Sequence, residues 1–296
     1  MKLVVSGASG LVGSALVEHL QAQGHDVWTL VRRHPGKKEL FWDVRGQQID
    51  SFGFNDIDAV VHLAGESIAG SRWSENKKCR IKESRVAGTR LLCRTLAALK
   101  HPPKVLVSAS AVGFYGDGGD QILTEDSPAG TNFLAEVCTA WEAETRVAKE
   151  AGIRVVNLRV GIVLAKNGGA LKPMVPAFRM GLGGPLGTGQ QWMSWIALPD
   201  LVRVIVHCMD DCSISGPVLG VSPTPVTQKT FARALGRALR RPALLPAPGF
   251  ALKLLMGEMG QQLLLDGQRC IPRRLNETGF EWHFPDLLPA LKRCVR

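Results

Sequence analysis

Tyrosine is nearly absent from this sequence of 296 residues, which contains a single one, Tyr115. Long hydrophobic runs are also missing. The longest, such as Val160–Ala165 and Trp195–Leu198, fall far short of the ~18 residues that a membrane-spanning helix needs. The segment Met1–Val5 lacks the cationic, apolar and cleavage regions of a secretory signal peptide. We therefore expect a cytoplasmic protein that does not associate with membranes.

The seven cysteines are an odd number and show no metal-ligand spacing, so we expect reduced thiols and no metal site. The 36 Lys and Arg residues exceed the 26 Asp and Glu residues, which gives a formal net charge of +10. Such an excess favours phosphorylated ligands, nucleic acid or anionic lipid. The basic residues are dispersed in short pairs and no nucleic-acid-binding motif accompanies them, so the sequence argues against a nucleic-acid partner.

Strand-like and helical patterns alternate in the first half of the chain. Continuous apolar runs are typical of parallel strands that are covered on both faces. The alternation predicts right-handed crossovers and an α/β fold with a doubly wound parallel sheet, whose ligand site lies beyond the carboxyl ends of the strands. The predicted strands are Lys2–Ser6, Asp26–Val31, Ala59–Leu63, Lys104–Ser108 and Arg154–Leu158, and the predicted helices are Leu11–Gln23, Glu83–Leu99 and Phe133–Ala151.

The composition of the chain changes after Leu164 and becomes rich in glycine, with seven glycines from Gly168 to Gly189. Helical patterns follow at Gln228–Leu239 and Phe250–Met256, separated by a proline-rich joint. We predict a dinucleotide-binding domain formed by residues 1–165 and about 190–222. A smaller C-terminal lobe, formed by about 166–189 and 223–296, would bind a small-molecule substrate in the cleft between the two.

A glycine-rich turn joins the first predicted strand to the first helix. The residues Val4–Gly13 read VVSGASGLVG. In this context Gly7 permits the tight turn, Gly10 the close approach of a diphosphate, and Gly13 close packing of helix on sheet. Backbone N–H groups and the positive helix end would hold the diphosphate of a dinucleotide. The predicted contacts are Gly7, Ser9, Gly10, Leu11, Val12 and Gly13.

Two arginines follow the second predicted strand. NAD-binding proteins normally have a carboxylate at this position, where it hydrogen-bonds the adenosine ribose. This chain has Val31 there, followed by Arg32 and Arg33. A guanidinium can bind the 2′-phosphate of NADP, and the missing carboxylate removes the repulsion that would exclude it. The sequence therefore predicts NADP(H), with a solvated charge pair as the alternative interpretation.

These motifs together resemble the extended short-chain dehydrogenase/reductase superfamily, whose common fold is the NAD(P)-binding Rossmann fold. The resemblance is closer to its YfcH-like epimerase family, an atypical group that includes the members of class 39U. It covers nearly the whole chain. The motifs that carry it are GASGLVG at 7–13, VHLAGE at 61–66, RW at 72–73, SASAVGFYGD at 108–117, LRVGIVL at 158–164, FRMGLGGPLG at 178–187 and GQRCIPRR at 267–274.

The resemblance implies further cofactor contacts. Leu63, Ala64 and Gly65 would run beneath the adenosine ribose and the bridging phosphates, with Glu66 directly after them. Arg159 follows the strand that leads to the nicotinamide and substrate region in extended relatives. A core arginine satisfied by carbonyl groups is the other interpretation of Arg159.

Extended relatives pair a serine with a Tyr-x-x-x-Lys on the next helix. The lysine lowers the pKa of the tyrosine and holds the nicotinamide ribose, the tyrosine exchanges the carbonyl proton, and the serine stabilises the oxyanion. Ser110 fits the serine position, but Leu134 and Cys138 stand near the tyrosine and lysine positions. Tyr115, which shapes a loop in relatives, is the remaining candidate acid beside Ser110.

The expected substrate contacts come from three loops around the cleft. An arginine there would suit a carboxylate or phosphate, and each tryptophan could equally be a core residue. The segment from Trp195 to Asp200 departs from the usual pattern by having Ala197 in place of histidine, and Asp200 is expected to cap the following helix. The candidates are Arg72, Trp73, Gln190, Trp195, Gln268 and Arg269.

The sequence thus predicts an NADP(H)-dependent oxidoreductase or a nucleotide-sugar-type epimerase that acts on a carbonyl, alcohol or sugar-like molecule. The alternative is a non-catalytic NADP(H) sensor or interaction protein that has lost the Tyr-x-x-x-Lys pair. A homodimer is expected by analogy with relatives.

Overall fold

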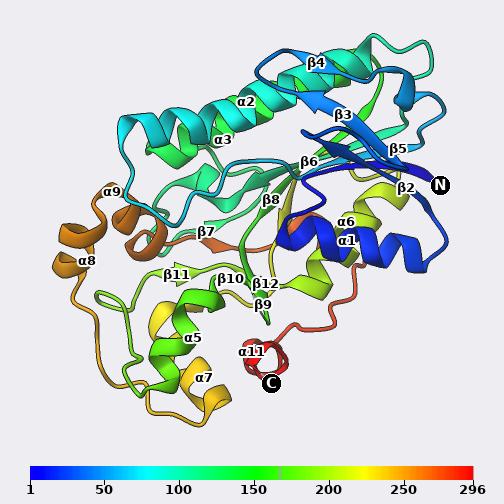
Figure 1. The fold of residues 1–296 in the computed structure, drawn as a ribbon. Helices are drawn as coiled ribbons and strands as arrows, with labels where there is room; N and C mark the ends of the chain where they lie inside the picture. Colours follow the sequence, from blue (N-terminus) through cyan, green and yellow to red (C-terminus); the bar gives the residue numbers. More distant parts are fainter. Residues whose placement is uncertain (167, 296) are drawn as a thin grey trace.

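A twisted sheet forms the centre of the computed structural model, which describes residues 1–166 and 168–295 (Figure 1). All neighbouring strands of the sheet are parallel except the last pair, which is antiparallel. The predicted α/β fold with a doubly wound parallel sheet is confirmed. The strand order is β13 (Gly216–Gly220), β8 (Arg154–Val160), β6 (Val105–Ala111), β5 (Ala59–His62), β1 (Lys2–Ser6), β2 (Asp26–Val31), β3 (Glu39–Asp43) and β4 (Gln48–Ile49).

Helices cover both faces of this sheet (Figure 1). One face carries α1 (Leu11–Ala22) and α6 (Leu198–Asp210), and the other carries α2 (Glu75–Ala97), α3 (Phe133–Ala143) and α4 (Arg146–Glu150). The alternation of strand side chains supplies both cores: Leu3 and Val5 pack on the α1 side, whereas Val4 packs on the α2 side. Apolar residues on both faces explain the continuous hydrophobic runs of the strands.

The part of the described chain that lies outside the main sheet contains three small sheets and several further helices. Its core includes Trp195, Phe231 and Leu291, all fully buried. The sheets are β9 (Ile162–Ala165) with β10 (Gly168–Gly169) and β12 (Trp195–Ala197), β11 (Trp192–Met193) with β14 (Val226–Thr227), and β7 (Ile122–Leu123) with β15 (Arg269–Cys270). The helices are α5 (Leu171–Arg179), α7 (Gln228–Leu239), α8 (Gly249–Met256), α9 (Glu258–Gly260), α10 (Arg273–Glu277) and α11 (Leu287–Val295). Single turns occupy Phe52–Phe54, Val112–Tyr115 and Gln261–Leu265.

Gly161 alone separates β8 from β9, so the main sheet leads directly into the small sheet that contains β9. Its amide donates to the carbonyl of Gly220, and the next amide, of Ile162, donates to the carbonyl of Ser194. A Cβ at position 161 would lie 2.5 Å from the Ser194 oxygen. The joint is therefore tightly packed.

Several element boundaries differ from the sequence prediction. Helix α2 begins at Glu75 rather than Glu83, because the Ser74 side chain accepts the Lys77 amide and caps it. The helix predicted over Phe133–Ala151 is two helices, α3 and α4, and the Thr145 hydroxyl donates to the Glu142 carbonyl at the break. The strands β3, β4 and β13 extend the predicted sheet at both edges.

The predicted division into domains remains a prediction, but one segment of the predicted lobe packs on the main sheet. Leu275 of α10 and Phe280 belong to the same buried cluster as Leu3 and Val218. Residues 273–280 thus return to the dinucleotide-domain side of the molecule.

Within the described ranges, no helix combines the length and the apolar character that crossing a membrane would require. The seven cysteines are free thiols, and of these Cys79 and Cys212 are exposed.

Candidate functional site

The glycine turn lies at the carboxyl end of β1, where the backbone of three segments converges. Gly7 has a φ of +70°, and a Cβ there would lie 2.8 Å from the Ala64 nitrogen and from the carbonyl of Leu63. A Cβ on Gly13 would lie 2.2 Å from the Gly7 oxygen. Both positions therefore require glycine, the first for conformation and both for space.

Helix α1 begins at this turn with its N-terminus open. Gly10 is the N-cap residue and supplies no side-chain hydrogen bond, and the first turn contains no acidic residue. The amides of Leu11, Val12 and Gly13 have no intrahelical acceptor because of their position in the helix. These N–H groups and the helix dipole form a site suited to a phosphate group. Ser9 is exposed directly before them.

A buried polar chain that sequence reasoning missed fixes the loop after β5. The Ser6 hydroxyl accepts the Leu63 amide at 3.1 Å and lies 2.6 Å from Nδ1 of His62. Nε2 of His62 lies 3.0 Å from Oγ1 of Thr89 on α2, which also accepts the indole N–H of Trp141. Burial lowers the pKa of His62 to about 4, so the ring is neutral at pH 7. The Leu63–Ala64 backbone is thereby held against the glycine turn.

The two arginines after β2 differ in their surroundings. Arg33 forms a two-pronged ion pair with Glu39, with nitrogen–oxygen distances of 2.6 and 2.7 Å. Arg32 is exposed, and none of the residues at 1–166 and 168–295 forms a hydrogen bond or an ion pair with its guanidinium. Of the pair, Arg32 is therefore the one whose guanidinium is available to a ligand.

Gly65 and Glu66 follow Ala64 along the same loop, with Gly65 exposed. The Glu66 carboxylate accepts from Nζ of Lys77 at 2.8 Å and from Nε of Arg80 at 3.3 Å. These partners, Lys77 first, lower the pKa of Glu66. Two side chains of α2 thus engage the Glu66 carboxylate. The predicted contact of Glu66 with the cofactor would therefore use its backbone rather than its side chain.

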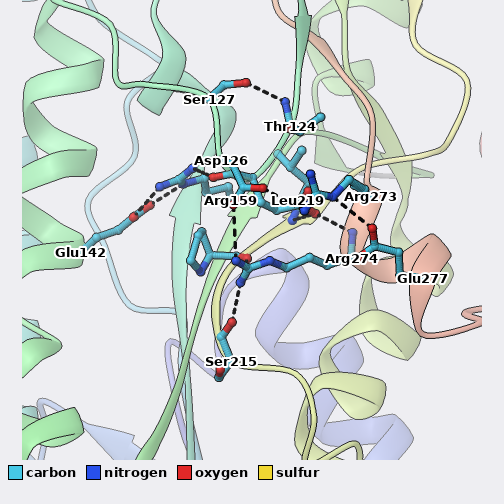
Figure 2. A network of polar contacts seen from close by, with 12 residues as sticks. Thr124, Asp126, Ser127, Glu142, Arg159, Ser215, Leu219, Arg273, Arg274 and Glu277 are labelled. Carbon is cyan, nitrogen blue, oxygen red and sulfur yellow. Dashed lines mark hydrogen bonds and ion pairs between the residues drawn. The ribbon is translucent and has the colours of Figure 1, made fainter.

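Ser110, Tyr115 and Arg159 belong to one buried network. The Ser110 hydroxyl donates to Oε1 of Glu142 at 2.6 Å. Nε and Nη2 of Arg159 each donate to Glu142 at 2.9 Å, and Nη1 donates to the Tyr115 hydroxyl at 2.9 Å and to the Glu125 carbonyl at 3.0 Å. Figure 2 shows Arg159 facing Glu142 across this network. Glu142 was not among the predicted site residues.

This network changes the interpretation of two predicted residues. Arg159 is 4% exposed and its guanidinium is engaged by protein groups, so it is the core arginine that the sequence left as the second interpretation. The Tyr115 hydroxyl donates to the Thr124 carbonyl, and burial raises the pKa of Tyr115. Tyr115 therefore shapes the loop and is poorly placed to exchange a proton with a ligand.

The helix that carries the Tyr-x-x-x-Lys pair in extended relatives is α3. At the two positions, Leu134 and Cys138 are both buried. Burial raises the pKa of Cys138 to about 11, so its thiol is neutral at pH 7. Neither side chain of α3 supplies the proton or the positive charge of the usual pair.

Both predicted tryptophans are core residues. Trp195 is 0% exposed, and its indole N–H donates to the Thr224 carbonyl at 3.0 Å. Trp73 donates to the Ile68 carbonyl at 2.7 Å and packs edge-on against Phe133. Direct contact of Trp195 with a substrate is thus contradicted by its burial, since no face of the ring reaches the surface.

The remaining substrate candidates contact different parts of the structure. Arg72 is exposed and approaches Gly257 at the end of α8, whereas Gln190 is exposed in the glycine-rich stretch. Gln268 donates from Nε2 to the Gly116 carbonyl at 2.6 Å. Cζ of Arg269 lies 4.3 Å from the ring centre of Trp192. Gln268 is therefore the candidate that the fold brings beside the turn after β6, whereas Arg269 lies over Trp192.

Comparison with known proteins agrees with this geometry. Residues 3–217 match the NAD dependent epimerase/dehydratase family, and residues 247–294 match a domain of unknown function, DUF1731. Among curated relatives, Epimerase family protein Mb2239 of Mycobacterium bovis is 42% identical over 290 residues, which are 98% of this chain and 96% of the relative. Epimerase family protein SDR39U1 of Homo sapiens is 37% identical over 298 residues, the full length of both.

Solved structures give the same result. The crystal structure of human SDR39U1 (isoform 2) with NADPH is similar with a TM-score of 0.91 and 35% identity, over 99% of each chain. UDP-N-acetylglucosamine 4-epimerase from Bacillus cereus, at 17% identity and a TM-score of 0.75 over 99% of this chain and 98% of that one, shares the fold. The resemblance to the extended short-chain superfamily and to class 39U is confirmed. The chain belongs to the NAD dependent epimerase/dehydratase family.

Proposed function

We propose that this protein binds NADP(H) at the glycine turn and uses it for hydride transfer at a carbonyl or secondary alcohol, or for an epimerisation of nucleotide-sugar type. The observation that carries the proposal is that no side chain caps the N-terminus of α1, while Arg32 is exposed and has no hydrogen-bond or ion-pair partner among the described residues. The first suits a diphosphate and the second a 2′-phosphate. The NADPH in the crystal structure of human SDR39U1 supports the same choice of coenzyme.

The residues present fit such a coenzyme. Gly7 and Gly13 exclude side chains from the turn, and Ser6 holds Leu63 and Ala64 beside it. The dinucleotide, when bound, supplies or accepts a hydride at its nicotinamide ring. The protein contributes the alignment of the ring with the substrate.

Ser110 is the side chain proposed to exchange a proton with the substrate oxygen. Its own hydrogen points to Glu142, which leaves the oxygen lone pairs available to an alcohol proton. During oxidation the proton would pass from the substrate to Ser110 Oγ as the Ser110 proton moves to Glu142, and reduction would reverse both transfers. Arg159 is a positioning residue, because it fixes Glu142 from the opposite side.

Calorimetry with NADPH and with NADH tests the binding, and oxidation of NADPH with a panel of carbonyl compounds tests the turnover. We expect tighter binding of NADPH and a reaction that Ser110→Ala abolishes. Ser108→Ala is the matched control, since Ser108 lies on the same strand with a fully buried side chain. Absence of binding to either coenzyme would refute the proposal. Tight binding without turnover across the panel would instead favour the non-catalytic sensor.

A further inference from the structure

Helix α8 is apolar on nearly every side, yet none of its residues is buried. Its eight residues include one charged side chain, Lys253. Phe250, Leu254 and Leu255 are 76, 74 and 73% exposed. A helix that is apolar all round is normally buried in a protein core or in a membrane. Within the described part of the chain, α8 therefore lacks a partner that covers these side chains.

The segments beside α8 add further exposed apolar side chains. The amides of Leu245 and Ala247 donate to the carbonyls of Gly183 and Pro185, so the proline-rich joint before α8 runs beside the glycine-rich stretch after α5. Clustered apolar side chains of this kind mark a binding surface. The apolar patch, in which each side chain is more than half exposed, consists of Met180, Leu182, Leu244, Leu245, Phe250, Leu254 and Leu255.

The same part of the chain is rich in basic residues and contains no acidic ones. Residues 166–199 and 212–257 include nine Lys and Arg residues but no Asp or Glu. Helix α7 packs against α5 and exposes Arg233 and Arg237 one turn apart on the same face (Figure 1). The next acidic residue in the chain, Glu258, pairs with a lysine of α2. Positive charge without acidic neighbours in the chain thus accompanies the apolar patch.

Charge complementarity distinguishes the possible occupants of this surface. A second copy of the chain would bring the basic residues of a twofold interface against themselves, and like charges repel. Nucleic acid would neutralise the charge, but its phosphate backbone offers little to exposed leucines. A lipid surface with anionic headgroups satisfies both features, because acyl chains accept the apolar side chains and headgroups attract Lys and Arg.

We propose that α8 and the rest of the apolar patch lie on the surface of a bilayer that contains anionic lipid. Phe250, Leu254 and Leu255 enter the headgroup layer, and Lys253 with the arginines of α7 contacts the lipid phosphates. The sequence argued against membrane association because no segment is long enough to span a bilayer. A helix that lies in the interface does not need that length. The inference is independent of coenzyme binding.

Flotation of the purified protein with vesicles tests the proposal. The vesicles contain phosphatidylcholine alone or an equal mixture of phosphatidylcholine and phosphatidylglycerol. We expect the wild type to bind the mixed vesicles and to be released by high salt, because salt screens the attraction to the headgroups. The double variant with Leu254→Ser and Leu255→Ser should bind them at least about 10-fold more weakly, since two leucines no longer leave water. Lys253→Glu should weaken binding by about 5- to 30-fold.

Two exposed residues elsewhere provide matched controls. Phe52 is 84% exposed in the turn after β4, and Arg94 is exposed in the last turn of α2, as Lys253 is in α8. Phe52→Ser and Arg94→Glu should each bind the mixed vesicles within about twofold of the wild type. If melting curves show that the double variant does not fold, Phe250→Ser provides the same test.

Four outcomes would overturn the proposal. The wild type could fail to bind either kind of vesicle, or the double variant could bind as tightly as the wild type. A dimer in analytical ultracentrifugation that the double variant loses would assign the apolar patch to a second copy of the chain. Binding to polyglutamate that is as tight as vesicle binding and is lost in the double variant would assign it to an acidic protein.

Discussion

The hydroxyl of Ser110 lies 2.6 Å from Oε1 of Glu142, the carboxylate that also receives two hydrogen bonds from Arg159. The strand register explains the meeting, because Ser110 on β6 is the direct neighbour of Arg159 on β8. Glu142 then reaches both from α3. One carboxylate thus connects the proposed proton-exchanging residue to a buried arginine.

We predict that Glu142→Ala destabilises the protein far more than Ser110→Ala. Removing Glu142 leaves Arg159 buried without its ion pair, which typically costs about 3 to 5 kcal/mol of the free energy of unfolding. Removing the Ser110 hydroxyl eliminates one hydrogen bond, at about 1 kcal/mol. Urea denaturation of the two variants measures the difference. Similar losses in both would show that the Arg159–Glu142 pair adds little to stability.

A second prediction concerns acid stability. The pKa of His62 is about 4 in the folded protein, against about 6.5 in an unfolded chain. The unfolded state therefore binds the proton first. As the pH falls from about 6.5 to 4, this residue alone lowers the free energy of unfolding by about 3 kcal/mol, and above pH 6.5 it has no further effect.

His62→Gln isolates that contribution, because the amide keeps a donor and an acceptor but does not titrate. The difference in the free energy of unfolding between the wild type and the variant should decrease between pH 6.5 and 4 in urea titrations. A difference that is constant with pH would mean that His62 is protonated in both states or in neither.

The third prediction tests coenzyme choice. Arg32→Asp should lower the affinity for NADPH by at least about 10- to 100-fold, since a charge-assisted hydrogen bond is lost and repulsion is added. The affinity for NADH should be unchanged or improved. Arg33→Ala is the control, because its exposed ion pair with Glu39 contributes little. If the NADPH to NADH ratio is the same in both variants, Arg32 does not recognise the 2′-phosphate.

The fourth prediction concerns the glycine turn. Gly13→Ala places a methyl group 2.2 Å from the Gly7 oxygen, so the turn must shift at a cost of about 1 to 3 kcal/mol. NADPH binding should weaken with it. Gly88→Ala is a matched change in α2, where the added Cβ would have ordinary contacts of 3.5 Å or more. Calorimetry and melting temperatures that rank the two variants alike would contradict the role of Gly13.

The features that could be predicted from the sequence are those that depend on residues close together in the chain. The strands β1 and β2 have the predicted bounds, because their continuous apolar runs reflect burial on both faces. The glycine turn could be predicted in the same way, since the three glycines, the strand before them and the helix after them lie within one short segment. In contrast, β13 was missed, because Gly216, Pro217 and Gly220 interrupt its apolar run.

Contacts between distant segments could not be predicted. His62 and Ser6 are 56 residues apart, and Glu142 meets Arg159 and Ser110 only through the fold. Asp200 shows the same limit. It was expected to cap α6, but it lies inside the first turn of that helix and accepts the amides of His283 and Phe284. Which acceptor a buried polar side chain meets depends on tertiary contacts rather than on its neighbours in the chain.

The single glycine between β8 and β9 has a consequence for how a molecule reaches the site. Gly161 and Ile162 are hydrogen-bonded to Gly220 and Ser194, and a methyl group has no space there. The backbone at Gly161 therefore cannot act as a hinge. We expect the main sheet and the small sheet that contains β9 to move together as one rigid body. Entry of a small molecule into the site would then depend on movements of surface side chains and loops rather than on rotation of one sheet against the other.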